Sequence, residues 1–139
     1  MFIEDRDYKV VCNDETLDII TQSDPQARLD AETSAQEEVE GYLRARYDSA
    51  KAFAATGEAR NAMLVRVTVS IALFYLGQWL PQFMGNEQRE IMYKNAIAWL
   101  RDVQNGKAMP DLPLYESADG EDAQNPVRYG SLPASKYTY

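Results

Sequence analysis

The chain has 139 residues, of which 45% are hydrophobic and 26% charged, as expected for one folded globular domain. Its 22 acidic and 14 basic residues give a net charge of -8, which argues against a protein that grips nucleic acid phosphates through Lys and Arg. The absence of histidine and the single cysteine exclude histidine-based triads, the usual zinc sites and internal disulfides, so we expect neither a metal nor a cofactor.

The amino-terminal region predicts two short helices. Acidic residues follow the apolar pair Phe2 and Ile3, which favours a first helical turn within residues 1–11, with an edge strand at Tyr8–Cys12 as the alternative. A second short helix is expected over residues 13–22, because N-cap residue types precede its apolar positions.

A long second helix is predicted from Pro25 to about Arg46. It begins with an N-cap residue and a proline at the first helical position, and its apolar residues follow one face. The opposite face is expected to be exposed to solvent rather than to hold a catalytic carboxylate pair, because an exposed face does not separate two pKa values. That face carries Asp30, Glu32, Glu37, Glu38 and Glu40.

The following segment, Tyr47–Arg60, is rich in Ala, Ser and Gly and is interpreted as a connection that could hold a broken helical turn, anchored by Phe53. After it comes the longest apolar stretch, Asn61–Leu80, whose apolar residues occupy every side of a helix. A membrane span is the competing interpretation. Because Arg66 and several polar residues interrupt the stretch, it predicts the buried central helix of an all-α bundle.

The last helix is predicted to begin at Asn86 and to stop at Asn105–Gly106, a glycine signal for helix ends. It contains Trp99, and Trp79 lies near the end of the predicted central helix. A ligand-binding pair of tryptophans is conceivable, but aromatic residues at helical spacing are typical of a core.

Beyond Gly106 the helical pattern fails, because prolines and glycines interrupt it. We therefore expect a helical domain at residues 1–110 and an extended linker and arm at residues 111–139. The arm ends in Asn125–Tyr139, which holds three tyrosines and two basic residues but no acid. Docking onto a partner and simple terminal disorder are both open for this segment.

Several stretches carry a resemblance to a known family. They include EVEGYLRARYD at 38–48 and YKNAIAWLRDVQNGKAMPDLP at 93–113, supported by ETLDIITQSD at 15–24 and GEARN at 57–61. In this order they cover nearly the whole chain, and the chain resembles the small all-α head-to-tail adaptor proteins of tailed bacteriophages, in the Mu-like neck family.

The resemblance implies a structural virion protein without an active site, assembled in the host cytoplasm and located in the neck. Such a protein forms a ring, expected to be a dodecamer, beneath the portal protein. The ring continues the DNA channel without binding DNA specifically, and it receives the tail. The implied partners are the portal protein, neighbouring copies and the next neck or tail ring protein, and no membrane is involved.

Three groups of residues are candidate contacts in such a ring. Glu32, Glu37 and Glu40 could face the channel, where acidic side chains would repel passing DNA. Arg44, Arg46 and Tyr47 could meet a neighbouring copy, although the arginines could equally cap the second helix. The arm contributes Arg128, Tyr129, Lys136, Tyr137 and Tyr139 as interface anchors.

Three other functions are considered. A helical interaction module, or another neck or tail-completion ring protein, would have the same bundle and tail. A hydrolase based on carboxylates alone would need a strongly perturbed acid in a concave pocket, and no sequence motif predicts one.

Overall fold

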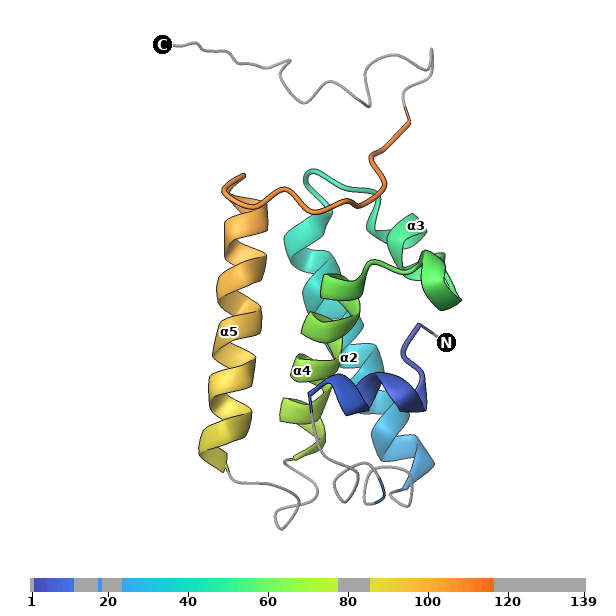
Figure 1. The fold of residues 1–139 in the computed structure, drawn as a ribbon, viewed down its shortest axis with the longest axis vertical. Coiled ribbons are helices and arrows are strands. Elements are labelled where there is room, and N and C mark those ends of the chain that lie inside the picture. Colours follow the sequence, from blue (N-terminus) through green and yellow to red (C-terminus); the bar gives the residue numbers. More distant parts are fainter. Residues whose placement is uncertain (1, 12–17, 19–23, 78–85, 117–139) are drawn as a thin grey trace.

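The computed structural model describes residues 2–11, 18, 24–77 and 86–116, and every regular element within these ranges is helical. This confirms the all-α prediction. Three long helices stand side by side in Figure 1, and they are α2 (Pro25–Leu43), α4 (Ala62–Leu76) and α5 (Asn86–Gln104).

Helix α4 is the central helix, in contact with α2, α5 and the amino-terminal 3-10 helix η1 (Asp5–Val10). Most of its residues are buried, as its apolar sides predict. The buried hydroxyls of Thr68 and Ser70 donate to the carbonyls of Leu64 and Arg66, four residues earlier, at 2.7 and 2.9 Å. These two hydroxyls are therefore buried with their hydrogen bonds formed.

Helix α2 starts as its sequence predicts. The Asp24 carboxylate accepts a hydrogen bond from the backbone N–H of Gln26 at 3.1 Å, and Pro25 occupies the first helical position. The helix ends at Leu43 with Arg44 as its C-cap, slightly earlier than expected. Its inner face, which includes Ala35 and Val39, is fully buried against α4 and α5.

The segment interpreted as a connection contains regular structure, namely α3 (Ser49–Ala54) and the 3-10 turn η2 (Gly57–Ala59). The expected helical turn is present as a six-residue helix and a 3-10 turn, and Asp48 caps α3 by accepting from the Lys51 N–H at 3.1 Å. Phe53 is buried as predicted, and its ring meets Phe2 edge-on with centroids 4.6 Å apart.

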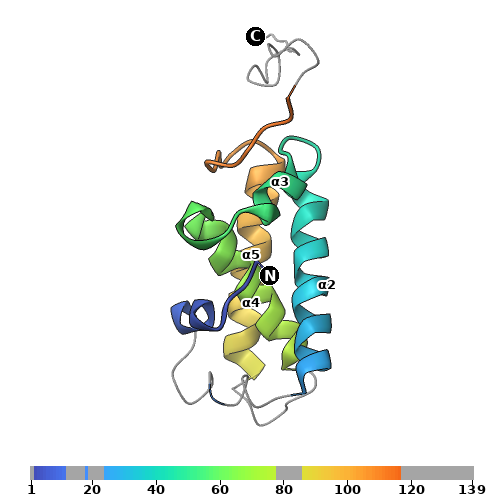
Figure 2. The ribbon, with the colours of Figure 1, turned by 90° about the vertical axis from the view of Figure 1, so that its right-hand side faces the viewer.

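At the amino terminus, η1 confirms a helical turn and excludes the strand at residues 8–11. The helix predicted for residues 13–22 lies outside the described residues except for Asp18, which is helical. Figure 2 shows α2 on one side of the molecule and η1 on the other. No described helix is long and apolar enough to cross a bilayer.

Helix α5 ends close to the predicted position, and Gly106 adopts the positive φ of 81° that suits a glycine after a helix. Trp99 is partly buried against the core, as predicted, whereas Trp79 lies outside the described residues. Residues 107–116 then cross the end of the bundle (Figure 1). Since Leu112 is buried, core packing continues past residue 110.

Candidate protein-interaction surfaces

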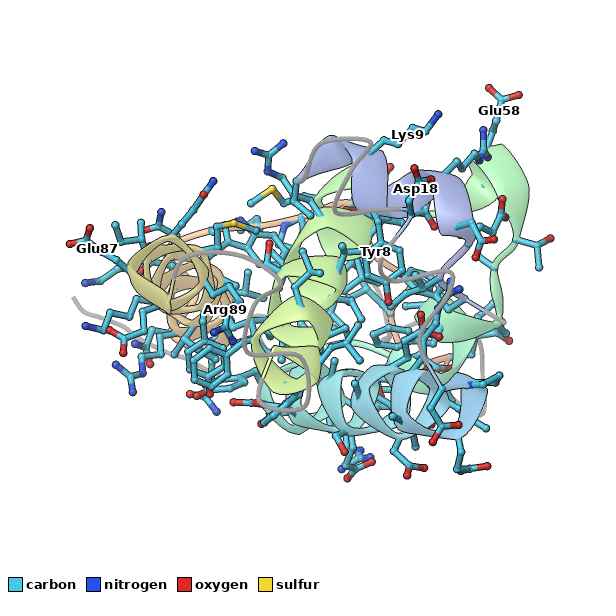
Figure 3. The ribbon with its side chains drawn as sticks, turned by 90° about the horizontal axis from the view of Figure 1, so that it is seen from below. Tyr8, Lys9, Asp18, Glu58, Glu87 and Arg89 are labelled. Carbon is cyan, nitrogen blue, oxygen red and sulfur yellow. The ribbon has the colours of Figure 1, made fainter. Side chains whose placement is uncertain are left out.

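The amino-terminal segment is locked onto α2 through a buried carboxylate. Tyr8 is fully buried and donates its hydroxyl to Glu32 at 2.5 Å, while the Arg28 Nε donates to the same Glu32 oxygen at 3.0 Å. Figure 3 shows the Tyr8 side chain pointing from η1 into the bundle. Burial, and then the charge of Glu32, raises the pKa of the Tyr8 phenol, so it stays protonated as the donor.

Glu32 is therefore corrected from an exposed channel residue to a buried structural one, with a side chain only 7% exposed. The reason is geometric, because the Tyr8 side chain reaches from η1 to Glu32, and Arg28 of the same helix binds it as well. A sequence pattern that places Glu32 among other acids cannot show that a tyrosine and an arginine from the same chain enclose it.

A second lock joins the first residues to the loop before α4. The Arg60 guanidinium binds both carboxylate oxygens of Asp7, at 2.6 and 3.1 Å, and also donates to the Phe2 carbonyl at 2.6 Å. Burial alone would raise the pKa of Asp7. Hydrogen bonds from Arg60 and from the Glu4 backbone, with the charge of Arg60, lower it below its ordinary value. We call residues 2–8 with Glu32 and Arg60 the N-terminal clasp.

A third polar cluster joins all three long helices. Glu38 of α2 accepts the hydroxyl of Tyr75 from α4 at 2.5 Å and that of Tyr93 from α5 at 2.7 Å. Burial, followed by the hydrogen bond and charge of Glu38, raises the pKa of Tyr75 to about 12 and also raises that of Tyr93. Glu38 was predicted to be solvated, but it instead fixes the relative position of the helices.

The predicted contacts at the end of α2 are used largely within the chain. Arg44 pairs with Glu37 at 2.9 Å and with Glu40 at 3.4 Å. Arg46 donates to the backbone carbonyl of Gln104 at 3.1 Å, which ties the ends of α2 and α5 together. Within the described residues neither arginine side chain binds a terminal carbonyl of α2, and both side chains remain accessible at the surface.

Tyr47 was predicted at an interface and is buried instead, with 8% of the residue exposed. It packs in the same core cluster as Phe53. The sequence places it directly after two exposed arginines, but the chain turns there from α2 toward α3, and this turn directs the ring inward. Tyr47 is therefore corrected from a surface contact to a core residue.

The face of α2 that was expected to be acidic exposes fewer carboxylates than its sequence implies. Of the three predicted channel carboxylates, Glu37 is 68% exposed, Glu40 is 15% exposed and Glu32 is buried. The Glu37 carboxylate accepts a hydrogen bond from the Arg44 guanidinium, and Glu40 also accepts one from the Ser49 hydroxyl. This face does not present a wall of free carboxylates.

The base of the carboxyl-terminal segment is anchored to the body. The Asp48 N–H donates to the Pro113 carbonyl at 2.8 Å, and the Tyr115 hydroxyl donates to the Arg44 carbonyl at 2.8 Å. An exposed ion pair joins Lys51 and Glu116. The predicted arm residues, namely Arg128, Tyr129, Lys136, Tyr137 and Tyr139, lie outside the described residues.

A surface groove on the η1 side was not predicted from the sequence. It measures about 280 Å³ and lies between α4 and α5 next to the end of η1. Its lining includes Val11, Met63, Arg66, Gln88, Met92 and Asn95. The one available signal was Arg66, the only charged residue within the apolar stretch that forms α4.

The described residues contain no group of three or more acidic or cysteine side chains that could hold a metal ion.

Comparison with known proteins gives one match. No curated protein and no solved structure matches the chain. The model of the family described as Bacteriophage Mu, Gp36 matches residues 3–129, which is most of the sequence. The chain therefore belongs to the bacteriophage Mu Gp36 family and is a phage protein of particle structure or morphogenesis.

Proposed function

We propose that this protein is a head-to-tail adaptor, a structural part of the virion neck that forms a ring beneath the portal protein. DNA passes through the ring, and the tail attaches to it through the next neck or tail ring protein. Family membership supports the phage setting. The resemblance of its sequence segments to neck adaptors supports the position in the particle.

The observation that carries the proposal is a helical body held together by buried polar contacts, followed by a carboxyl-terminal segment whose first residues are hydrogen-bonded to that body. The N-terminal clasp and the Glu38 cluster hold the helices in one arrangement. Tyr115 and Pro113 attach the start of the carboxyl-terminal segment to the same body. A ring subunit needs this combination, because a rigid wedge sets the closure angle while an extended segment can reach a partner.

We further propose that the role is passive rather than catalytic. The buried carboxylates of Asp7 and Glu32 are engaged in ion pairs and hydrogen bonds that fold the chain. The net charge of -8 supports passage of DNA without specific binding, because like charges repel.

The arm provides the contact with the portal or with a neighbouring copy in this proposal. Its end is basic and rich in tyrosine, in contrast to the acidic body. Tyrosine and arginine are enriched among residues that dominate binding energy. The proposed anchors are Arg128, Tyr129, Lys136, Tyr137 and Tyr139.

The test compares the full chain with a chain that ends at Glu116. We expect the shortened protein to keep the helical circular dichroism of the body but to lose binding to purified portal assemblies. A matched control replaces only the acidic residues at 119, 121 and 122 with Asn or Gln, and it should still bind. Undiminished binding by the shortened chain would exclude the arm, and absence of the protein from purified virions would exclude the adaptor function.

A further inference from the structure

The groove on the η1 side combines apolar side chains with a cation that has no ion-pair partner among the described residues. Met63 and Met92 line it from α4 and α5. Arg66 also lines the groove and is exposed, and it forms no ion pair within the described part of the chain. Methionine adapts its shape to a partner surface, and an exposed guanidinium is available to a carboxylate.

Exposed apolar residues extend this surface beyond the groove. Met63 is 40% exposed and Ile91 is 52% exposed. Ile91 lies three residues after Gln88 and four before Asn95, both of which line the groove, so it borders the same side of α5. We call Met63, Arg66, Ile91 and Met92 the groove patch.

A surface of matching character lies on α2. Leu29 is 41% exposed, and the neighbouring Asp30 is exposed as well. Within the described residues the Asp30 carboxylate accepts only the side-chain amide of Gln26, in its own helix. We call Leu29 and Asp30 the α2 patch.

The two patches belong to different sides of the molecule. In Figure 3, α2 forms the lower edge of the view and η1 the upper edge, and the groove lies on the η1 side, next to Val11. One copy therefore cannot satisfy its own patches. Successive copies placed head to tail can each join their groove patch to the α2 patch of the next copy, and this heterologous arrangement is the one that closes into a ring.

We propose that the groove patch of one copy receives the α2 patch of a second copy, with Leu29 against the methionines and Asp30 paired with Arg66. This inference rests on the proposed ring and specifies the contact between its subunits. It assigns the amino-terminal half of α2 to subunit contact instead of the channel wall.

Charge decides between this occupant and the basic end of the arm, Asn125–Tyr139. Arg128 and Lys136 would bring like charge toward Arg66, which disfavours the arm end in this groove. The α2 patch offers one carboxylate and one apolar side chain, which complement Arg66 and the two methionines of the groove. A second copy is therefore the partner with the matching chemistry.

The test uses charge reversal in the full chain. We expect Arg66→Glu and Asp30→Arg each to weaken self-association at least tenfold in sedimentation velocity experiments, with unchanged circular dichroism. An equimolar mixture of the two variants should associate as the wild type does, because each mixed contact again joins opposite charges. The matched controls, Lys107→Glu and Asp111→Arg, alter exposed residues beyond α5 and should have no effect.

Cross-linking adds a direct readout of proximity. In a chain carrying Cys12→Ser, the pair Leu29→Cys and Met63→Cys should form disulfides between copies under mild oxidation and yield a ladder of oligomers. The proposed contact is overturned if both single variants associate as the wild type does, or if their mixture fails to recover association. It is also overturned if no ladder of disulfide-linked oligomers forms. If portal binding persists in those cases, the adaptor function stands and only this interface falls.

Discussion

Removal of the Arg60 side chain is the sharpest test of how the fold is held together. Arg60 and Asp7 have side chains that are only 5% and 8% exposed, and their closest N–O distance is 2.6 Å. Arg60→Met keeps much of the aliphatic stem but leaves the Asp7 carboxylate buried without its cation. It also removes the donor to the Phe2 carbonyl.

The expected loss follows from burial of the remaining charge. Breaking one partner of a buried ion pair destabilises a protein by about 3–5 kcal/mol. Against a total stability of roughly 5–15 kcal/mol, this is a large fraction. At roughly 3 °C per kcal/mol for a domain of this size, the Tm should fall by about 10–15 °C.

The assay is urea and thermal unfolding followed by far-ultraviolet circular dichroism. Arg6→Ala is the matched control, because Arg6 pairs with Glu4 at the surface and should matter by less than about 1 kcal/mol. The double variant Asp7→Leu with Arg60→Met should recover part of the loss, since no lone charge remains. A loss below about 1 kcal/mol for Arg60→Met would refute the reasoning.

The same ion pair predicts a response to acid. The pKa of Asp7 is lowered in the folded state from its ordinary value of 3.8. Its stabilising contribution is therefore complete above that value and is lost as the pH falls through the folded pKa. Asp7→Asn should remove this part of the acid sensitivity. If the free energy of unfolding of this variant still declines with acid as the wild type's does, Asp7 is not the group responsible.

The remaining predictions concern helix glycines and the tyrosine cluster. Gly77→Ala should destabilise the protein by about 1–3 kcal/mol, because the new Cβ would lie 1.7 Å from the buried Arg89 guanidinium, which lies between α5 and α4 in Figure 3. The Cβ of Gly41→Ala meets nothing within 4 Å, so this variant should stabilise by up to about 1 kcal/mol. Urea unfolding measures both. Tyr75 has its pKa raised to about 12, so its contribution to stability is complete below pH 10 and declines as the pH rises toward 12. Glu38→Gln should move that ionisation toward the ordinary value in an absorbance titration, and an unmoved transition would count against the hydrogen bond.

The elements that the sequence predicted well are those with strong local signals. Pro25 after an N-cap aspartate, the apolar run of α4 and Gly106 after α5 each reflect backbone chemistry that acts within a few residues. The sequence predicted only a helical turn within residues 47–60 and not the bounds of α3, because Phe53 packs against Phe2, which is distant in the sequence.

The candidate surfaces were harder to predict because they depend on what covers each side chain. Glu32 and Tyr47 have polar neighbours in the sequence, yet both are buried, Glu32 by the distant Tyr8 among others and Tyr47 within the core cluster. Conversely, Met63 belongs to an apolar run and is partly exposed, since α5 leaves part of α4 open. Periodicity identifies the faces of a helix, but only packing decides which face stays accessible.

The N-terminal clasp also sets an order for folding during synthesis. Asp7 must wait for Arg60, which is 53 residues later, and at about 5–20 residues per second this delay lasts roughly 3–10 s. During that time Phe2, Ile3 and Tyr8, which are buried in the finished fold, have no core to enter. Residues 2–8 are thus translated well before their partner Arg60, and a nascent chain interrupted before Arg60 would leave them available to chaperones and proteases.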